Sequence, residues 1–119
     1  YHYLPPTIKA KPSLVLIKEI KSYFEQQNLP FQTGKTWTTD AFFRETKRKL
    51  QTRKQQGCLT VEMEAATFFA VAQFRQIDLA QILYISDSVH EEDGWGGIQQ
   101  KFLIREHLFW HTANILFHF

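Results

Sequence analysis

The fold is decided by the stretch LTVEMEAATFFAVAQF, residues 59–74. Its first residues form a short apolar run typical of a strand, and from Glu64 on it is rich in Ala and Phe, which predicts a buried helix. Two glutamates inside such a run are unusual, because charged groups are rarely buried without a partner. We therefore place Glu62 at the end of a strand and Glu64 at the start of a helix, where a carboxylate can face a cleft.

The segments on either side continue this alternation of strand and helix. The pattern predicts strands at residues 31–37, 58–62 and 79–86, and helices at residues 12–28, 43–57, 64–75 and from residue 98 to the end. Gly34 in the first strand predicts a bulge or a close backbone approach. The third strand is almost continuously apolar, so both of its faces should be covered. Phe102, Phe109, Ala113 and Leu116 mark one face of the last helix. This alternation predicts an α/β fold.

Length and composition indicate an ordinary globular protein. The 119 residues suffice for one modest domain, residues 1–119, and the net charge of +2 gives no strong attraction to nucleic acid or membrane. The single Cys58 cannot form an intramolecular disulfide, which favours a reducing, cytoplasmic setting. No apolar run reaches the roughly 20 residues of a membrane span, and no signal peptide is visible. The opening YHYLPP, starting at Tyr1, suggests a fragment or processed chain.

Three positions after strands are candidates for a binding site. Glu64 could accept hydrogen bonds from two hydroxyls of a vicinal diol, or it could only favour the helix N-terminus through the dipole. Asp87, after Ser86 at the end of the third strand, could be a general acid or could cap a turn. Phe42 or Phe43 could stack on a planar base or belong to the core. Because the ends of neighbouring strands meet at one crevice, the three positions together favour a binding site more than any one of them alone.

At this point the residues carry a resemblance. TWTTDAFFRET, GCLTVEMEAATFFAVAQFR and ILYISDS resemble the C-terminal half of the nucleoside phosphorylase family, which comprises purine and uridine phosphorylases and their nucleosidase relatives. The resemblance runs from about His2 to Asp87, and VEMEAA followed at this distance by SD is fairly specific. After Trp95 it is loose. It implies part of a three-layer α/β/α fold with a central mixed sheet, incomplete here, and a homo-oligomer.

The resemblance also implies a reaction and a set of residues. The family cleaves nucleosides by attack of phosphate, or of water in the nucleosidases, on C1′, with phosphate as co-substrate and no metal or other cofactor. Carried over, the sugar-binding glutamate falls on Glu64, and Met63 packs against the sugar. Glu62 lines the same pocket, and Phe42 stacks on the base. The acid that protonates purine N7 falls on Asp87, supported by Ser86.

Two departures from the family leave alternatives open. The Gly-rich phosphate loop and its arginines are not in this stretch, since Gly94 to Gly97 follow Asp87, so the 119 residues alone should be inactive. Lys101 stands where the family has an arginine that orients the acid. The ammonium group of a lysine does not replace the planar guanidinium group of an arginine, which donates two parallel hydrogen bonds. The favoured interpretation is the C-terminal portion of a nucleoside phosphorylase-like protein of purine salvage, a pentosyltransferase for which Asp87 favours purine nucleosides. The alternatives are a nucleosidase, or a catalytically incompetent domain that binds a nucleoside or a protein partner.

Two further sequence features would suggest metal binding or nucleic-acid binding, but each lacks the residues that such a site needs. His107 and His111 are spaced i, i+4, but no third metal ligand is evident, so we expect no metal site. A basic face at residues 47–54 would need clustered aromatics and a higher pI to favour nucleic acid. We therefore expect nucleoside and phosphate as partners, and neither nucleic acid nor membrane.

Overall fold

The computed structural model describes residues 3–5, 9–86 and 98–117. The chain divides by compactness into two units, Tyr1–Gln81 and Ile82–Phe119. The single domain over residues 1–119 stays a prediction.

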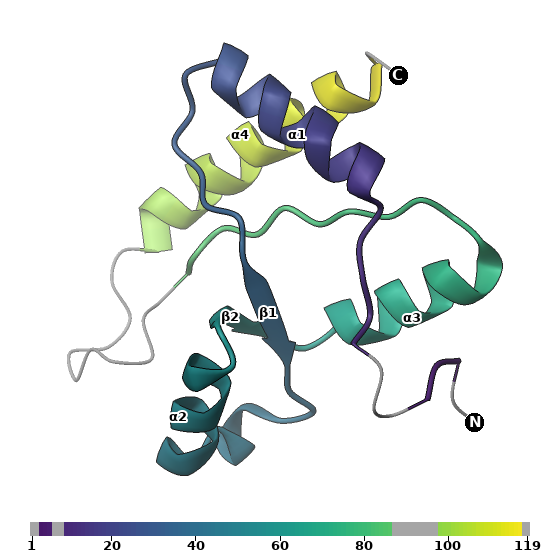
Figure 1. The fold of residues 1–119 in the computed structure, drawn as a ribbon. Coiled ribbons are helices and arrows are strands. Elements are labelled where there is room, and N and C mark those ends of the chain that lie inside the picture. The colour runs from purple at the N-terminus through teal and green to yellow at the C-terminus, as the bar shows by residue number, and fades with distance from the viewer. Residues whose placement is uncertain (1–2, 6–8, 87–97, 118–119) are drawn as a thin grey trace. The chain divides into compact units, whose positions relative to one another are not determined.

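The first unit is built on a pair of parallel strands. Strand β1 (Lys35–Thr38) pairs with strand β2 (Cys58–Glu62), and helices precede, join and follow them (Figure 1). Helix α2 contacts β2, and helix α3 contacts β1. The helical elements of this unit are α1 (Leu14–Gln26), the 3₁₀ turn η1 (Phe42–Arg44), α2 (Lys47–Gln55) and α3 (Ala65–Arg75). The α/β class is thereby confirmed, with two strands in the described part of the chain.

The ends of α1 follow from local sequence. The Ser13 hydroxyl accepts a hydrogen bond from the Leu16 N–H, so Ser13 is the N-cap and the helix begins at Leu14, two residues later than predicted. At the other end Asn28 has a φ of 53°, and the Leu29 N–H donates to the Phe24 carbonyl at 2.9 Å. This is a Schellman ending, and it stops the helix at Gln26, before Pro30, close to the predicted position.

Gly34 allows the two strands to approach each other. A Cβ added there would lie 2.2 Å from Cδ1 of Leu59, so the Leu59 side chain would have to move. Immediately beyond it the pairing shifts register between Lys35 and Thr36, because Leu59 is bypassed on β2. The pairing is thus irregular next to Gly34, where a bulge or a close backbone approach is predicted, and β1 is shorter than the predicted residues 31–37.

Helix α3 is buried along one face rather than all round. Ala65, Phe69 and Ala72 are buried, whereas Phe68 and Phe74 are more than half exposed. A sheet of two strands can cover only one side of a helix. The prediction of a fully buried helix is therefore wrong for the outer face.

The third predicted strand is wrong. Residues 79–86 are described without strand structure and have no ladder partner in the described part of the chain. Their apolar character favours a strand, but a strand also needs a neighbour whose backbone groups pair with its own. At its start, the Leu79 carbonyl instead accepts the Ser13 N–H at 2.8 Å, next to α1.

The second unit contains the last helix, α4 (Ile98–Phe117), where a terminal helix is predicted. Within this unit Arg105 Nε donates to the Tyr84 hydroxyl at 2.6 Å. Phe102, Phe109 and Leu116, on the predicted apolar face, are each more than half exposed. Among the described residues, none of the helices has the length and apolar character needed to cross a membrane.

Candidate functional site

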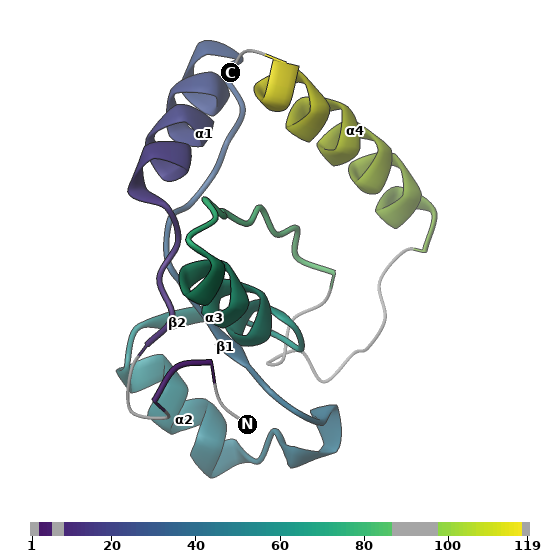
Figure 2. The same cartoon turned by 90° about the vertical axis from the view of Figure 1, so that its right-hand side faces the viewer.

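The carboxyl ends of β1 and β2 lie side by side. The pair is parallel, and Thr38 at the end of β1 is in register with Glu62 at the end of β2. From this edge β1 continues into the turn that carries Phe42, and β2 continues through Met63 into α3 (Figure 2). The structure therefore brings together two of the three predicted strand ends, at the edge where α/β proteins bind ligands.

Glu62 is fully engaged by its own protein. One carboxylate oxygen, Oε1, accepts a short hydrogen bond from the Thr38 hydroxyl. The other, Oε2, accepts from the backbone N–H of Glu64 at 2.7 Å and of Ala65 at 2.5 Å. These are N–H groups that a helix start leaves without an intrahelical partner. Glu62 thus caps α3 from the preceding strand, and its predicted contact with the sugar stays a prediction.

Thr38 completes this arrangement, and sequence analysis missed it. Its hydroxyl oxygen accepts the Ala66 N–H at 2.9 Å while its proton goes to Glu62. The Thr39 N–H donates to the Glu62 carbonyl at 2.8 Å, and Thr39 is buried. The signal available in the sequence was a threonine at the last position of a strand beside a second strand that also ends on a polar residue.

Glu64 presents the opposite situation. It occupies the N-cap position of α3 with φ −131° and ψ −28°, but its side chain makes no capping hydrogen bond. The residue is exposed, and its carboxylate has no hydrogen-bond or ion-pair partner in the described part of the chain. Met63, just before it, is 47% exposed. A carboxylate and a thioether side chain are therefore available to a ligand at this edge.

Phe42 and Phe43 follow β1 in the chain, in the 3₁₀ turn η1. They are 74% and 76% exposed and contact each other edge to face, with ring centroids 5.6 Å apart. The core alternative for these two rings is therefore wrong. The turn that carries them is fixed by an ion pair of 2.7 Å between Asp40 and Arg44. Both phenylalanines are free to stack on a planar group.

The predicted acid cannot be related to this edge. Asp87 lies outside the described residues, as do the glycines at 94–97 and the side chain of Lys101. Ser86 is described and exposed, and it belongs to the second unit. The geometry of the site therefore rests on Phe42 and on the Glu62 to Glu64 step.

Metal ligands do not gather in the part of the chain that is described. No three His, Cys, Asp or Glu side chains come close enough there to hold an ion.

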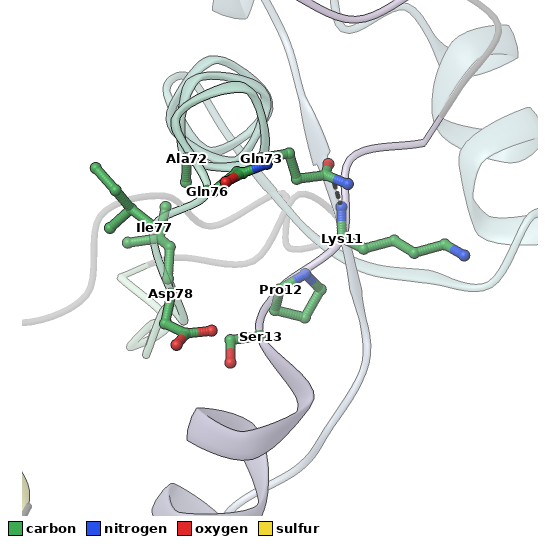
Figure 3. Close-up of a pocket in the computed structure, with 9 residues that line it drawn as sticks. Lys11, Pro12, Ser13, Ala72, Gln73, Gln76, Ile77 and Asp78 are labelled. Carbon is green, nitrogen blue, oxygen red and sulfur yellow. Dashed lines mark hydrogen bonds between the residues drawn. The ribbon is translucent and has the colours of Figure 1, made fainter.

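A cavity of about 300 Å³ lies elsewhere, at the C-terminal end of α3 (Figure 3). Ala72, Gln73 and Gln76 line it on one side, and Lys11 and Ser13 on the other. The Lys11 N–H donates to the Gln73 side-chain oxygen at 3.1 Å, which ties the two sides together. Because α3 is 11 residues long, this cavity is about 16 Å from the candidate site along the helix axis.

Comparison with known proteins supports the resemblance to the nucleoside phosphorylase family. A family model described as the phosphorylase superfamily matches residues 1–103. A purine nucleoside phosphorylase of the DeoD type from Exiguobacterium sp. is 32% identical over 63 residues, which is 53% of this chain. The aligned part is 27% of that relative, so the chain spans about a quarter of its length. The family match contains β1, β2 and α3, and it ends within α4.

Proposed function

Because the chain belongs to the phosphorylase superfamily, we propose that it carries the ribose- and base-binding residues of a nucleoside phosphorylase-like site. The full-length protein would transfer the pentosyl group of a purine nucleoside to phosphate. The similarity to a purine nucleoside phosphorylase supports the purine class.

One observation carries the proposal, namely the exposed carboxylate of Glu64. An acidic side chain at a helix start is ordinarily explained as a cap, but here Glu62 supplies the cap and leaves Glu64 without a partner in the described part of the chain. A carboxylate accepts two hydrogen bonds at once, and the 2′- and 3′-hydroxyls of ribose are two adjacent donors. Hydrogen bonds to a charged acceptor are stronger than neutral ones, so this pair would hold the sugar firmly.

The remaining contacts of the nucleoside are assigned to neighbouring residues. Phe42, exposed on the adjacent strand end, would stack on the base, and Met63 would pack against the sugar. Base stacking on an aromatic side chain contributes roughly 1–3 kcal/mol. Glu62 would act behind the sugar pocket rather than as its main acceptor.

In the proposed reaction a phosphate oxygen forms a bond to C1′ as the bond from C1′ to the base nitrogen breaks. The electron pair of that bond leaves with the base, and Asp87, supported by Ser86, would protonate the purine at N7. Phosphate is the co-substrate, and no metal or other cofactor takes part. We place this activity in purine salvage in the cytoplasm, in a homo-oligomer without nucleic-acid or membrane partners.

The test is release of hypoxanthine from inosine by the full-length protein, with and without phosphate. Glu64→Ala should lower kcat/KM about 100-fold, because two charge-assisted hydrogen bonds are lost. Glu25→Ala, which removes an exposed glutamate from α1, is the matched control and should be unchanged. A wild-type kcat/KM in Glu64→Ala would overturn the sugar assignment. Release without phosphate would identify a nucleosidase, and inosine binding without release would identify a binding domain.

A further inference from the structure

The hydrogen bonds around Glu62 form a closed network that ends on the backbone of Glu64. Thr38 donates to Glu62, Glu62 accepts from the N–H groups of Glu64 and Ala65, and Thr38 accepts from Ala66. The network joins the ends of both strands to the first turn of α3. Residues 28 positions apart are thereby connected by one hydroxyl group.

We propose that Thr38 and Glu62 are positioning residues that aim the Glu64 carboxylate at the ribose hydroxyls. This inference rests on the proposed function, since it assigns a purpose to the same site. Neither side chain need touch the nucleoside, because both act through the backbone that carries Glu64.

The backbone of Glu64 explains why such positioning is required. Its φ of −131° and ψ of −28° lie outside the helix, and its N–H has no partner within the helix. The bond from its N–H to Glu62 Oε2, at 2.7 Å, holds the amino side of this residue. On the carboxyl side, the Glu64 carbonyl accepts the Thr67 and Phe68 N–H groups at 3.1 and 3.2 Å, which ties it to α3. Without Glu62, the amino side of Glu64 would lose this hydrogen bond and the backbone that carries the carboxylate would be held on its carboxyl side only.

The network also explains why a threonine stands at the end of β1. Glu62 can accept but not donate, whereas Ala66 N–H can only donate. A hydroxyl does both, and Thr38 uses both capacities at once. Thr36, two residues earlier on the same strand, instead donates to the Thr60 carbonyl at 3.4 Å, within the strand pair. It is a matched control, with the same side chain on the same strand and no link to α3.

The test compares inosine with 2′,3′-dideoxyinosine by calorimetry on the full-length protein without phosphate. The dissociation constant of the dideoxy compound divided by that of inosine measures how much the two ribose hydroxyls contribute to binding. We expect this ratio to be about 100 in the wild type. Thr38→Val should lower this ratio about tenfold and leave the affinity for the dideoxy compound within about twofold. Thr36→Val should leave both unchanged, and Thr38→Ser, which keeps a hydroxyl, should keep the wild-type ratio.

The possible outcomes separate this inference from the proposed function. If Glu64→Ala reduces the ratio to about 1 while Thr38→Val keeps the wild-type ratio, the positioning role is wrong and the sugar assignment stands. If Glu64→Ala itself leaves the ratio unchanged, the proposed function is wrong at this residue. Should Thr38→Val fail to fold, Glu62→Gln carries the same test, because its amide reverses the hydrogen bond to Thr38. A full ratio in Glu62→Gln would then overturn the inference.

Discussion

The N-termini of α2 and α3 are capped in different ways. At α2 the N-cap residue caps its own helix, since the Thr46 hydroxyl accepts the Lys49 N–H at 3.3 Å. At α3 the N-cap residue, Glu64, leaves this task to Glu62 and Thr38. The first arrangement is ordinary helix stabilisation. In the second, capping by other residues leaves the charged side chain of Glu64 without a capping hydrogen bond.

The largest stability effect should come from removing the external cap. Glu62→Ala leaves two helix N–H groups and the Thr38 hydroxyl without their acceptor, so we expect a loss of about 2–3 kcal/mol in the free energy of unfolding. Glu64→Ala should change it by less than about 0.5 kcal/mol, because its carboxylate caps nothing. Urea denaturation of the two full-length variants measures this contrast. Equal losses would show that the two glutamates share the capping role.

A smaller effect is expected at the helices that cap themselves. Thr46→Ala and Ser13→Ala should each cost about 1 kcal/mol, because each removes one hydroxyl from one helix N–H. Glycine at either position should cost only a few tenths. Neither alanine variant should alter the dissociation constant of inosine, which calorimetry would check. A loss of inosine affinity in Thr46→Ala would remove the distinction between the two kinds of helix start.

The same contrast explains how much of the fold the sequence could predict. The ends of α1 and α2 depend on Ser13, Asn28, Thr46 and Gly57, which act within a few residues. Both helices were found, although α1 begins two residues and α2 four residues after its predicted start. The strand predicted at residues 79–86 depended on a partner elsewhere in the chain. An apolar run carries no information about that partner, so the prediction was wrong.

The candidate site likewise has features that depend on local sequence and one that depends on how the two strands pair. Glu64 and Phe42 became candidates because each follows a strand end, which is a local pattern, and the family resemblance then assigned them to the sugar and the base. The link between Thr38 and Glu62 depends on the register of two strands 24 residues apart. That register is set partly by the absence of a side chain at Gly34, where Leu59 approaches. Sequence patterns suggest a close approach there, but they do not indicate which residues become neighbours.

The smallest expected effect on stability is that of Asp40, an acidic residue in the turn after β1. Its side chain is 69% exposed, whereas Glu62 is partly buried. A hydrogen bond at its own backbone lowers the pKa of Asp40 below 3.8, and the charge of Arg44 lowers it further. Because the folded pKa is below the unfolded one, the ionised form favours folding above pH 3.8, and this contribution is lost as pH falls through the folded value. An NMR titration should show the pKa of Asp40 rising in Arg44→Ala, and rising less in Lys49→Ala, the weaker of the two charges. An unchanged titration in Arg44→Ala would mean that the ion pair does not persist in solution, and that the turn carrying Phe42 is held by its backbone alone.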